Sequence, residues 1–131
     1  LIPYVTLCLL RGEAPRLTSG GRDVDWIYVE DVVDGIVAAA QASDVEGKTI
    51  DIGSGELVAI RKVVEHLVRL TTPTIEPVFG ALADRPLEQV RAAARDRSNA
   101  LLGWKALVPL EQGLKRTVEW YGQQLKNGRF T

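Results

Sequence analysis

Four arginines gather in a short polar stretch between residues 84 and 97. They are Arg85, Arg91, Arg95 and Arg97. A guanidinium group can grip a phosphate or carboxylate through two parallel N–H donors, so such a stretch is able to hold an anionic ligand. Solvated surface charge is the alternative, and it is the stronger interpretation for Arg91, Arg95 and Arg97. The residues alone therefore predict an α/β domain with an anion site, and do not identify the anion.

A glycine loop, Gly53-Ser54-Gly55, follows an expected strand and precedes an expected helix. A dinucleotide-binding loop has this context. The third glycine of that fingerprint is missing, because Val58 stands in its place, and no acid ends a following strand about 20 residues later. We interpret the loop as a turn that reverses the backbone near a ligand, and not as a phosphate cradle for a cofactor.

The histidine and the acids do not form a metal motif. His66 has no second histidine or cysteine nearby in the sequence. Asp25 and Asp31 belong to an acidic cluster that lacks the glycine turn and the terminal glutamate of a calcium loop. We predict no metal site, and we interpret Asp31 as an acid at the start of a helix, where the helix dipole favours it.

Composition narrows the class of protein. The chain has 131 residues, with 16 Lys and Arg against 17 Asp and Glu, and this balance argues against a nucleic-acid partner. No run of about 18 apolar residues predicts a membrane span, and no secretory signal is visible. The one cysteine, Cys8, lies among leucines and is predicted to be a buried thiol in a reducing, cytoplasmic setting. The chain has no methionine and opens within an apolar pattern, which predicts a cut amino terminus.

The hydrophobic pattern predicts an α/β fold with too few strands for a complete doubly wound sheet. Helices are expected over residues 1–11, from 30 to about 40, around 60–68, and over 110–125, with one helical turn at 99–102. Strands are expected over residues 16–18, 24–29, 48–52 and 74–78. The first two strands could form a hairpin, because Ser19-Gly20-Gly21 between them reads as a tight turn.

Four motifs in this order resemble the carboxy-terminal part of the extended short-chain dehydrogenase/reductases. They are VDWIYVEDVV at residues 24–33, TIDIGSGE at 49–56, DRPLE at 84–88, and LGWK at 102–105 followed by LEQGL at 110–114 and VEWY at 118–121. That family includes UDP-glucose 4-epimerase and the nucleotide-sugar dehydratases. The resemblance covers almost the whole chain.

The resemblance implies an enzyme part and not a complete enzyme. Residues 1–126 would be the substrate-binding region with late elements of a Rossmann-type domain, and 127–131 a tail. An N-terminal Rossmann domain, absent from this chain, would bind most of the NAD or NADP. The family's catalytic Tyr-x-x-x-Lys pair is also absent, because Cys8, Val32 and Leu125 stand four residues after the three tyrosines. We therefore assign no catalytic residue and expect the isolated chain to be inactive.

Residue by residue, the resemblance implies a nucleotide-sugar site. Arg85 matches a family arginine that contacts the diphosphate, and Glu88 an acid near the ribose. Trp26 matches an aromatic residue beside the nucleotide, and the loop of Gly55, Glu56 and Leu57 lies near the base. Val24 departs from the pattern, because the family often has a second phosphate-binding arginine there. Arg22, on the same strand face, is the residue that could substitute.

The expected activity is epimerisation or dehydration of a nucleotide-sugar, with a homo-oligomer as one expected assembly. An apolar face is expected to meet the Rossmann domain. Two alternatives stay open. One is a non-catalytic nucleotide-binding or regulatory relative of the same fold, which Val24 and the Leu87 substitution in the DRPLE loop favour. The other is a stand-alone interaction domain.

Overall fold

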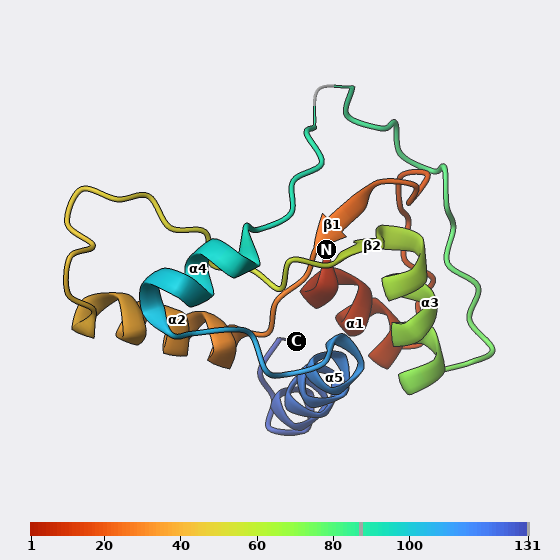
Figure 1. Ribbon diagram of the computed structural model, residues 1–131. Helices are drawn as coiled ribbons and strands as arrows, with labels where there is room; N and C mark the ends of the chain where they lie inside the picture. The colour runs from red at the N-terminus through yellow and green to blue at the C-terminus, as the bar shows by residue number, and fades with distance from the viewer. Residues whose placement is uncertain (87, 131) are drawn as a thin grey trace. The chain divides into compact units, whose positions relative to one another are not determined.

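The computed structural model describes residues 1–86 and 88–130, which fall into two compact units (Figure 1). Unit 1 contains Leu1–Arg22, Ala59–Gln89 and the segment from Glu111 onward. Unit 2 contains Asp23–Val58 and Val90–Leu110. Each unit therefore combines segments that lie far apart in the sequence. Leu87, the residue that replaces a family glycine, lies outside the described residues.

Unit 1 is built on three helices: α1 (Ile2–Leu10), α3 (Ile60–Leu70) and α5 (Leu110–Lys126). Helix α3 has apolar residues at positions that repeat every three or four residues, so one of its faces is continuous and apolar. That face packs against α1. The buried apolar side chains of the unit are Val5, Cys8, Leu9, Leu17, Ile60, Val63, Val64, Leu67, Leu114 and Val118.

The end of the chain returns to α5. The ring centroid of Phe130 lies 6.1 Å from that of Trp120 and 5.6 Å from that of Tyr121. The Arg11 guanidinium, just after α1, donates a hydrogen bond to the Phe130 carbonyl. The described residues after α5 therefore pack within unit 1, against α5 and the end of α1.

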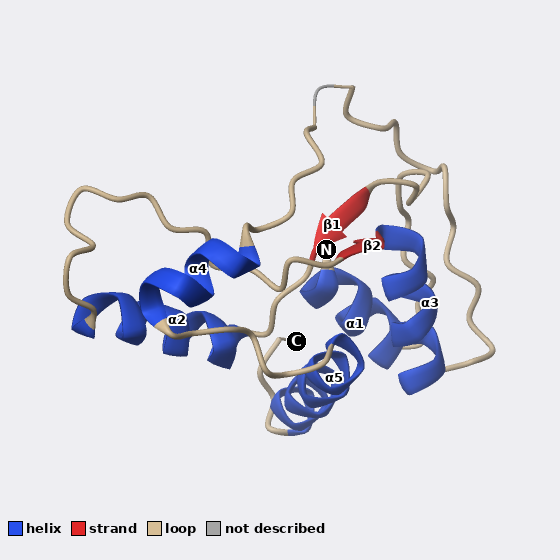
Figure 2. Ribbon diagram, viewed as in Figure 1, coloured by secondary structure: helices blue, strands red, loops and turns tan. Residues whose placement is uncertain are grey.

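Unit 2 is built on helices α2 (Val29–Gln41) and α4 (Arg95–Leu102), which pack together. Strand β1 (Asp23–Asp25) pairs with β2 (Leu57–Ala59), and Figure 2 shows how much loop connects these short elements. The side of α2 that packs inward carries Asp31 and Gly35. A Cβ atom at Gly35 would lie 2.9 Å from Ile52 Cδ1 and 3.0 Å from Trp104 Cε2, so only glycine allows these side chains to approach the helix this closely.

The apolar stripe predicted on α2 is present, but most of it faces solvent. Val33, Ile36 and Val37 are exposed, as is Val29 at the start of the helix. These four residues are called the α2 apolar face below. Periodicity identified the helix correctly, but it did not reveal that the buried side of the helix would be the one with a carboxylate and a glycine.

The α/β fold and the incomplete sheet are confirmed, since the described residues form one two-stranded sheet. The five helical predictions are confirmed, with α4 beginning at Arg95 and thus four residues before the predicted turn. None of the described helices has the length and apolar character that a membrane crossing needs.

The strand predictions were largely wrong. Residues 16–18 and 74–78 form only one parallel bridge, Arg16 to Val78, and residues 48–52 form no strand. The expected hairpin is absent, because β1 pairs with β2 instead. A strand needs a neighbour to satisfy its backbone groups, and an alternating pattern does not say which segment that neighbour will be.

Candidate functional site

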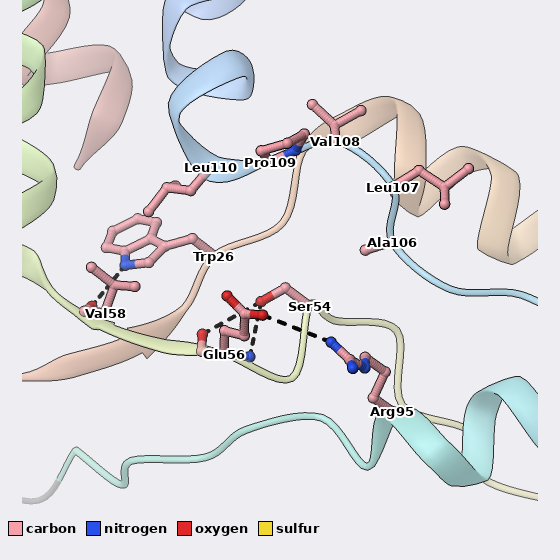
Figure 3. A pocket seen from close by; sticks show the side chains of 10 residues that line it. All are labelled: Trp26, Ser54, Glu56, Val58, Arg95, Ala106, Leu107, Val108, Pro109 and Leu110. Carbon is pink, nitrogen blue, oxygen red and sulfur yellow. Dashed lines mark hydrogen bonds and ion pairs between the residues drawn. The ribbon is translucent and has the colours of Figure 1, made fainter.

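Unit 2 contains a cavity of about 270 Å³ (Figure 3). Its walls come from three places: the residue after β1, the glycine loop with the start of β2, and the two ends of the segment that contains α4. The lining residues are Trp26, Ser54, Glu56, Val58, Arg95, Ala106, Leu107, Val108, Pro109 and Leu110. Seven of the ten lining residues have apolar side chains, and Arg95 and Glu56 add one cationic and one anionic side chain.

The indole of Trp26 is fixed at one wall. Its Nε1–H donates a 2.9 Å hydrogen bond to the carbonyl of Val58 in the neighbouring strand β2. Because the polar edge of the indole is satisfied by this bond, its apolar surface is available to the cavity that it lines. The pairing of β1 with β2 thus determines where this aromatic side chain lies.

Arg95 and Glu56 form the charged part of the cavity wall. Arg95 Nη1 lies 3.8 Å from Glu56 Oε1. The two side chains are 53% and 76% exposed, so water screens their attraction. An exposed pair at this distance contributes less than about 1 kcal/mol, and the guanidinium can readily exchange this partner for another anion.

Asp25, at the end of β1, holds the glycine loop in place. Its Oδ1 accepts hydrogen bonds from the Ser54 amide at 2.8 Å and the Ser54 hydroxyl at 2.6 Å. Its Oδ2 accepts from the Gly55 amide at 3.0 Å and from the Ala93 amide at 2.8 Å. One carboxylate therefore joins β1, the glycine loop and the segment that leads to Arg95.

The close approach of these groups explains Gly53. A Cβ atom there would lie 2.6 Å from both Asp25 Oδ2 and Ala93 Cβ, which no side chain could occupy without a shift of the backbone. Two amides of the glycine loop already donate to Asp25, which favours a turn over a phosphate cradle. The ionised carboxylate is the form that these donors stabilise. Burial raises the pKa of Asp25, but the bonds from Ala93, Ser54 and Gly55 outweigh burial and hold it below its ordinary value.

Asp31 plays a similar part at another wall of the cavity. It lies in the first turn of α2, as predicted, and its side chain is buried. Its Oδ1 accepts a 3.0 Å hydrogen bond from the Leu107 amide, and its Oδ2 a 2.9 Å bond from the Val108 amide. The carboxylate thus fixes the apolar wall of the cavity, a role that its position at a helix start did not indicate.

Unit 1 contains a separate charged cluster. Arg22 Nε lies 3.1 Å from Glu88 Oε2, and Arg85 Nη1 lies 3.5 Å from Glu88 Oε1. Arg85 is 81% exposed, whereas Arg22 and Glu88 are about one-third exposed. The two arginines and one glutamate leave this cluster with an excess of one positive charge. We call these three residues the Arg22–Glu88–Arg85 cluster.

The residues predicted from the resemblance thus fall into two groups. Arg22, Arg85 and Glu88 are together in unit 1, and Trp26 and Glu56 line the cavity of unit 2. The other two predicted residues, Gly55 and Leu57, do not line the cavity. Gly55 donates its amide to Asp25, and Leu57 begins β2 with an exposed side chain.

Sequence reasoning missed the roles of Asp25, Asp31 and Arg95. Asp25 had a usable signal, because an acid at a strand end and a later Gly-Ser-Gly turn supply an acceptor and a set of backbone donors. Arg95 was interpreted as surface charge, and only the fold places it at a cavity. No three His, Cys, Asp or Glu side chains converge as metal ligands within residues 1–86 and 88–130.

Comparison with known proteins finds similarity to epimerases and dehydratases. Residues 1–53 match the family model described as the NAD dependent epimerase/dehydratase family. The chain is 32% identical to dTDP-glucose 4,6-dehydratase of Shigella flexneri over 92% of its length. It is 28% identical to dTDP-D-glucose 4,6-dehydratase of Mus musculus over 97% of its length.

A solved structure has the same fold. UDP-glucose 4-epimerase of Thermotoga maritima, determined with UDP-glucose, superposes with a TM-score of 0.85 at 28% identity and covers 95% of this chain. The chain spans 35% and 36% of the length of the two dehydratases and 40% of the epimerase chain. The similarity therefore extends over nearly all of this chain and over little more than a third of each relative.

Proposed function

We propose that this chain, whose residues 1–53 match the NAD dependent epimerase/dehydratase family, forms the nucleotide-sugar-binding part of a sugar-nucleotide epimerase or dehydratase of that family. In this proposal, residues 1–126 bind the substrate, and 127–131 form a tail. The remaining part of the enzyme, a Rossmann domain, binds NAD or NADP and supplies the catalytic tyrosine and lysine. The 131-residue chain alone then catalyses no turnover.

The observation that carries the proposal is the Arg22–Glu88–Arg85 cluster. A nucleotide diphosphate needs cationic donors, and guanidinium groups bind phosphate oxygens in pairs. The guanidinium of Arg85 contacts Glu88, and its side chain is 81% exposed, so most of its donors face solvent. Arg22, held by the same glutamate, lies in the cluster and provides the second guanidinium where Val24 offers none. Glu88 is proposed to contact the ribose as well.

The predicted residues at and near the unit 2 cavity also support the proposal. Trp26 would contact the nucleotide through its indole, and the loop that contains Gly55, Glu56 and Leu57 would lie near the base. The hydrogen bonds of Asp25 give this loop one fixed conformation. A preformed loop binds a ligand with less loss of conformational entropy than a mobile one.

Binding of the diphosphate would contribute to catalysis although the diphosphate does not itself react. Binding energy from a remote, unreactive part of a substrate can position the carbon that reacts. The enzyme as a whole would oxidise a sugar hydroxyl with NAD or NADP and then epimerise or dehydrate the keto-sugar. The residues of this chain would bind and orient the substrate, in a cytoplasmic enzyme whose one cysteine, Cys8, is a buried free thiol.

The α2 apolar face is the proposed contact with the Rossmann domain. Val29, Val33, Ile36 and Val37 are exposed at helical spacing, and an exposed apolar stripe normally marks an interaction surface. When the chain is studied alone, this face is expected to favour self-association. We propose a homo-oligomer as the resulting state of the isolated chain.

The test joins the chain to its natural upstream sequence and measures nucleotide-sugar turnover for the wild type, Arg85→Ala and Arg16→Ala. Each charge-assisted hydrogen bond is worth about 1.5–3 kcal/mol, so the loss of Arg85 should raise KM by about tenfold or more. Arg16, an exposed arginine of the same unit, is the matched control and should leave KM unchanged. Equal KM values for the wild type and Arg85→Ala would remove Arg85 from the substrate site and contradict the proposal.

A further inference from the structure

We propose that Arg95 is the anion-binding residue of the unit 2 cavity, and that this cavity takes a flat ring that carries a phosphate or a carboxylate. The ring would lie against Trp26, and the anionic group would contact the guanidinium. The inference deepens the proposed function and rests on it for the nature of the ring. It adds a residue to the ligand site that the family motifs did not identify, and it concerns unit 2 alone.

The size of the cavity suits such a ligand. An apolar cavity of about 150 Å³ holds one benzene molecule. The cavity of unit 2 measures about 270 Å³, so it has room for one ring and a small charged group. Its walls of Trp26, Val58 and Leu110 suit the apolar ring, and Figure 3 shows Arg95 at the end of the cavity opposite to these residues.

The charge of Arg95 is available to a ligand. Arg95 is the cationic residue among the ten that line the cavity. Its ion-pair partner, Glu56, lies 3.8 Å away, and both side chains are more than half exposed. An anion with better geometry can therefore displace Glu56, which acts as a weak internal competitor for the same guanidinium.

The backbone of Arg95 is anchored, whereas its guanidinium has a weak contact with Glu56. The Arg95 amide donates a 2.9 Å hydrogen bond to the Ala93 carbonyl, and the Ala93 amide in turn donates to Asp25. The Arg95 Cβ lies only 3.1 Å from the place where a Cβ of Gly55 would be, so the glycine loop and Arg95 are packed closely. The backbone of Arg95 is therefore held beside the glycine loop, and its side chain begins at this wall of the cavity.

The other polar group of the cavity is already occupied. The Ser54 hydroxyl donates to Asp25 at 2.6 Å and accepts from the Glu56 amide at 3.1 Å. This hydroxyl serves the loop, which leaves it little capacity for a ligand. Recognition of an anion in the cavity consequently depends on Arg95.

The test measures binding of small probes to the 131-residue chain by isothermal titration calorimetry. The probes are phenyl phosphate, uridine 5′-monophosphate and inorganic phosphate. The variants are Arg95→Gln, Glu56→Gln and, as matched control on the same helix, Arg97→Gln, whose side chain is exposed and outside the cavity. Far-ultraviolet circular dichroism checks that each variant is folded.

We expect phenyl phosphate to bind more tightly than inorganic phosphate, because only the former fills the apolar part of the cavity. Arg95→Gln should weaken binding of phenyl phosphate by about tenfold or more. Glu56→Gln should strengthen it by a few-fold, because the competing carboxylate is gone, and a variant that merely unfolds the site could not produce this gain. Arg97→Gln should bind as the wild type does.

Several outcomes would overturn the inference: no saturable binding by the wild type at millimolar probe, equal affinities for Arg95→Gln and Arg97→Gln, or equal affinities for phenyl phosphate and inorganic phosphate. Tighter binding of uridine monophosphate than of phenyl phosphate would support a nucleotide as the ligand, and equal binding would support a simpler aromatic phosphate. Phenyl phosphate, which has no diphosphate, tests the unit 2 cavity and not the Arg22–Glu88–Arg85 cluster. The two proposals can therefore fail independently. The role of Arg95 is tested by probe binding to this chain, and the proposed function is tested by KM in the joined enzyme.

Discussion

The interiors of unit 1 and unit 2 are stabilised by different kinds of interaction. In unit 1, apolar side chains of α1 and α3 are fully buried, among them Val5, Leu9, Val64 and Leu67. In unit 2, the buried large apolar side chain is Trp104, and the inward contacts of α2 come from Asp31 and Gly35. The first unit has an ordinary hydrophobic core, whereas in the second unit carboxylates hold loop backbones.

Hydrophobic burial and carboxylate–backbone hydrogen bonds have different structural consequences. Hydrophobic burial is non-directional and fixes how helices pack, but it does not fix the conformation of a loop. A carboxylate that accepts several backbone N–H bonds fixes individual residues of a loop. Asp25 and Asp31 do this at two walls of the unit 2 cavity, and the side chains that line the cavity depend on those loops. Unit 2, which has the smaller hydrophobic core, is therefore the unit whose loop conformations are fixed by specific hydrogen bonds.

The largest effect is expected from a cavity in the core of unit 1. Leu67→Ala removes a side chain that is 0% exposed and should lower the free energy of unfolding by about 2–5 kcal/mol. Urea denaturation, followed by circular dichroism, measures the loss. Val33→Ala on the α2 apolar face, where 52% of the side chain is exposed, is the contrasting variant and should change stability by less than about 0.5 kcal/mol. Similar losses of unfolding free energy for both variants would show that this face of α2 is buried in solution. That result would contradict the difference between the two units.

An intermediate effect is expected from Asp31 in unit 2. Asp31→Ala leaves the amides of Leu107 and Val108 without their acceptor, and the loss of each part-buried hydrogen bond costs about 0.5–1.5 kcal/mol. Hydrogen exchange at these two amides should accelerate most. Asp34→Ala, on the same helix with an exposed side chain, is the control and should leave their exchange unchanged. If Asp31→Ala and Asp34→Ala behave alike, the wall at residues 107–108 is held by something other than this carboxylate.

The helices could be predicted from the sequence because their signals are local. Ile60, Val63, Val64 and Leu67 repeat at helical spacing, and the helix that they define is α3 with its apolar side buried. The strands could not be predicted with the same success. Residues 48–52 have strand character without a strand neighbour among the described residues, and the partner of β1 proved to be the segment at Leu57 and not the nearer one at residues 16–18.

The candidate site was predictable where a motif fixed both the residue and its surroundings. Motif matching placed Trp26 and Glu56 near one another, and both line one cavity. Arg95 could not be found in this way, because its position at the cavity depends on a chain of contacts through Ala93 to Asp25, residues that are 68 positions apart. Pairings at such separation are specified by the whole fold and not by a local pattern.

The smallest effect, and the most specific, is expected from acidification at Asp25. The hydrogen bonds to its carboxylate lower the pKa of Asp25 below the ordinary value of 3.8, so the unfolded chain takes up a proton before the folded one does. The stabilisation is therefore complete above the unfolded value and is lost as the pH falls through the lower folded value. The amide resonances of Gly55 and Ala93, which donate to this carboxylate, should titrate with a midpoint below 3.8 in NMR spectra.

Asp25→Asn should abolish this titration at Gly55 and Ala93. It should also lower stability, because each carboxylate oxygen accepts two hydrogen bonds and the NH2 group that replaces one of them cannot accept. Asp84 supplies an internal control in unit 1. Its carboxylate accepts from the Ser19 amide at 3.0 Å, and hydrogen bonds from the Ser19 side chain and backbone lower its pKa as well. The Ser19 resonance should therefore keep its acid titration in Asp25→Asn. A midpoint at or above 3.8 for Gly55, or a titration that persists in the variant, would mean that the Asp25 carboxylate does not hold the loop of the cavity. The contrast between a core-stabilised unit and a carboxylate-stabilised unit would then rest on Asp31 alone.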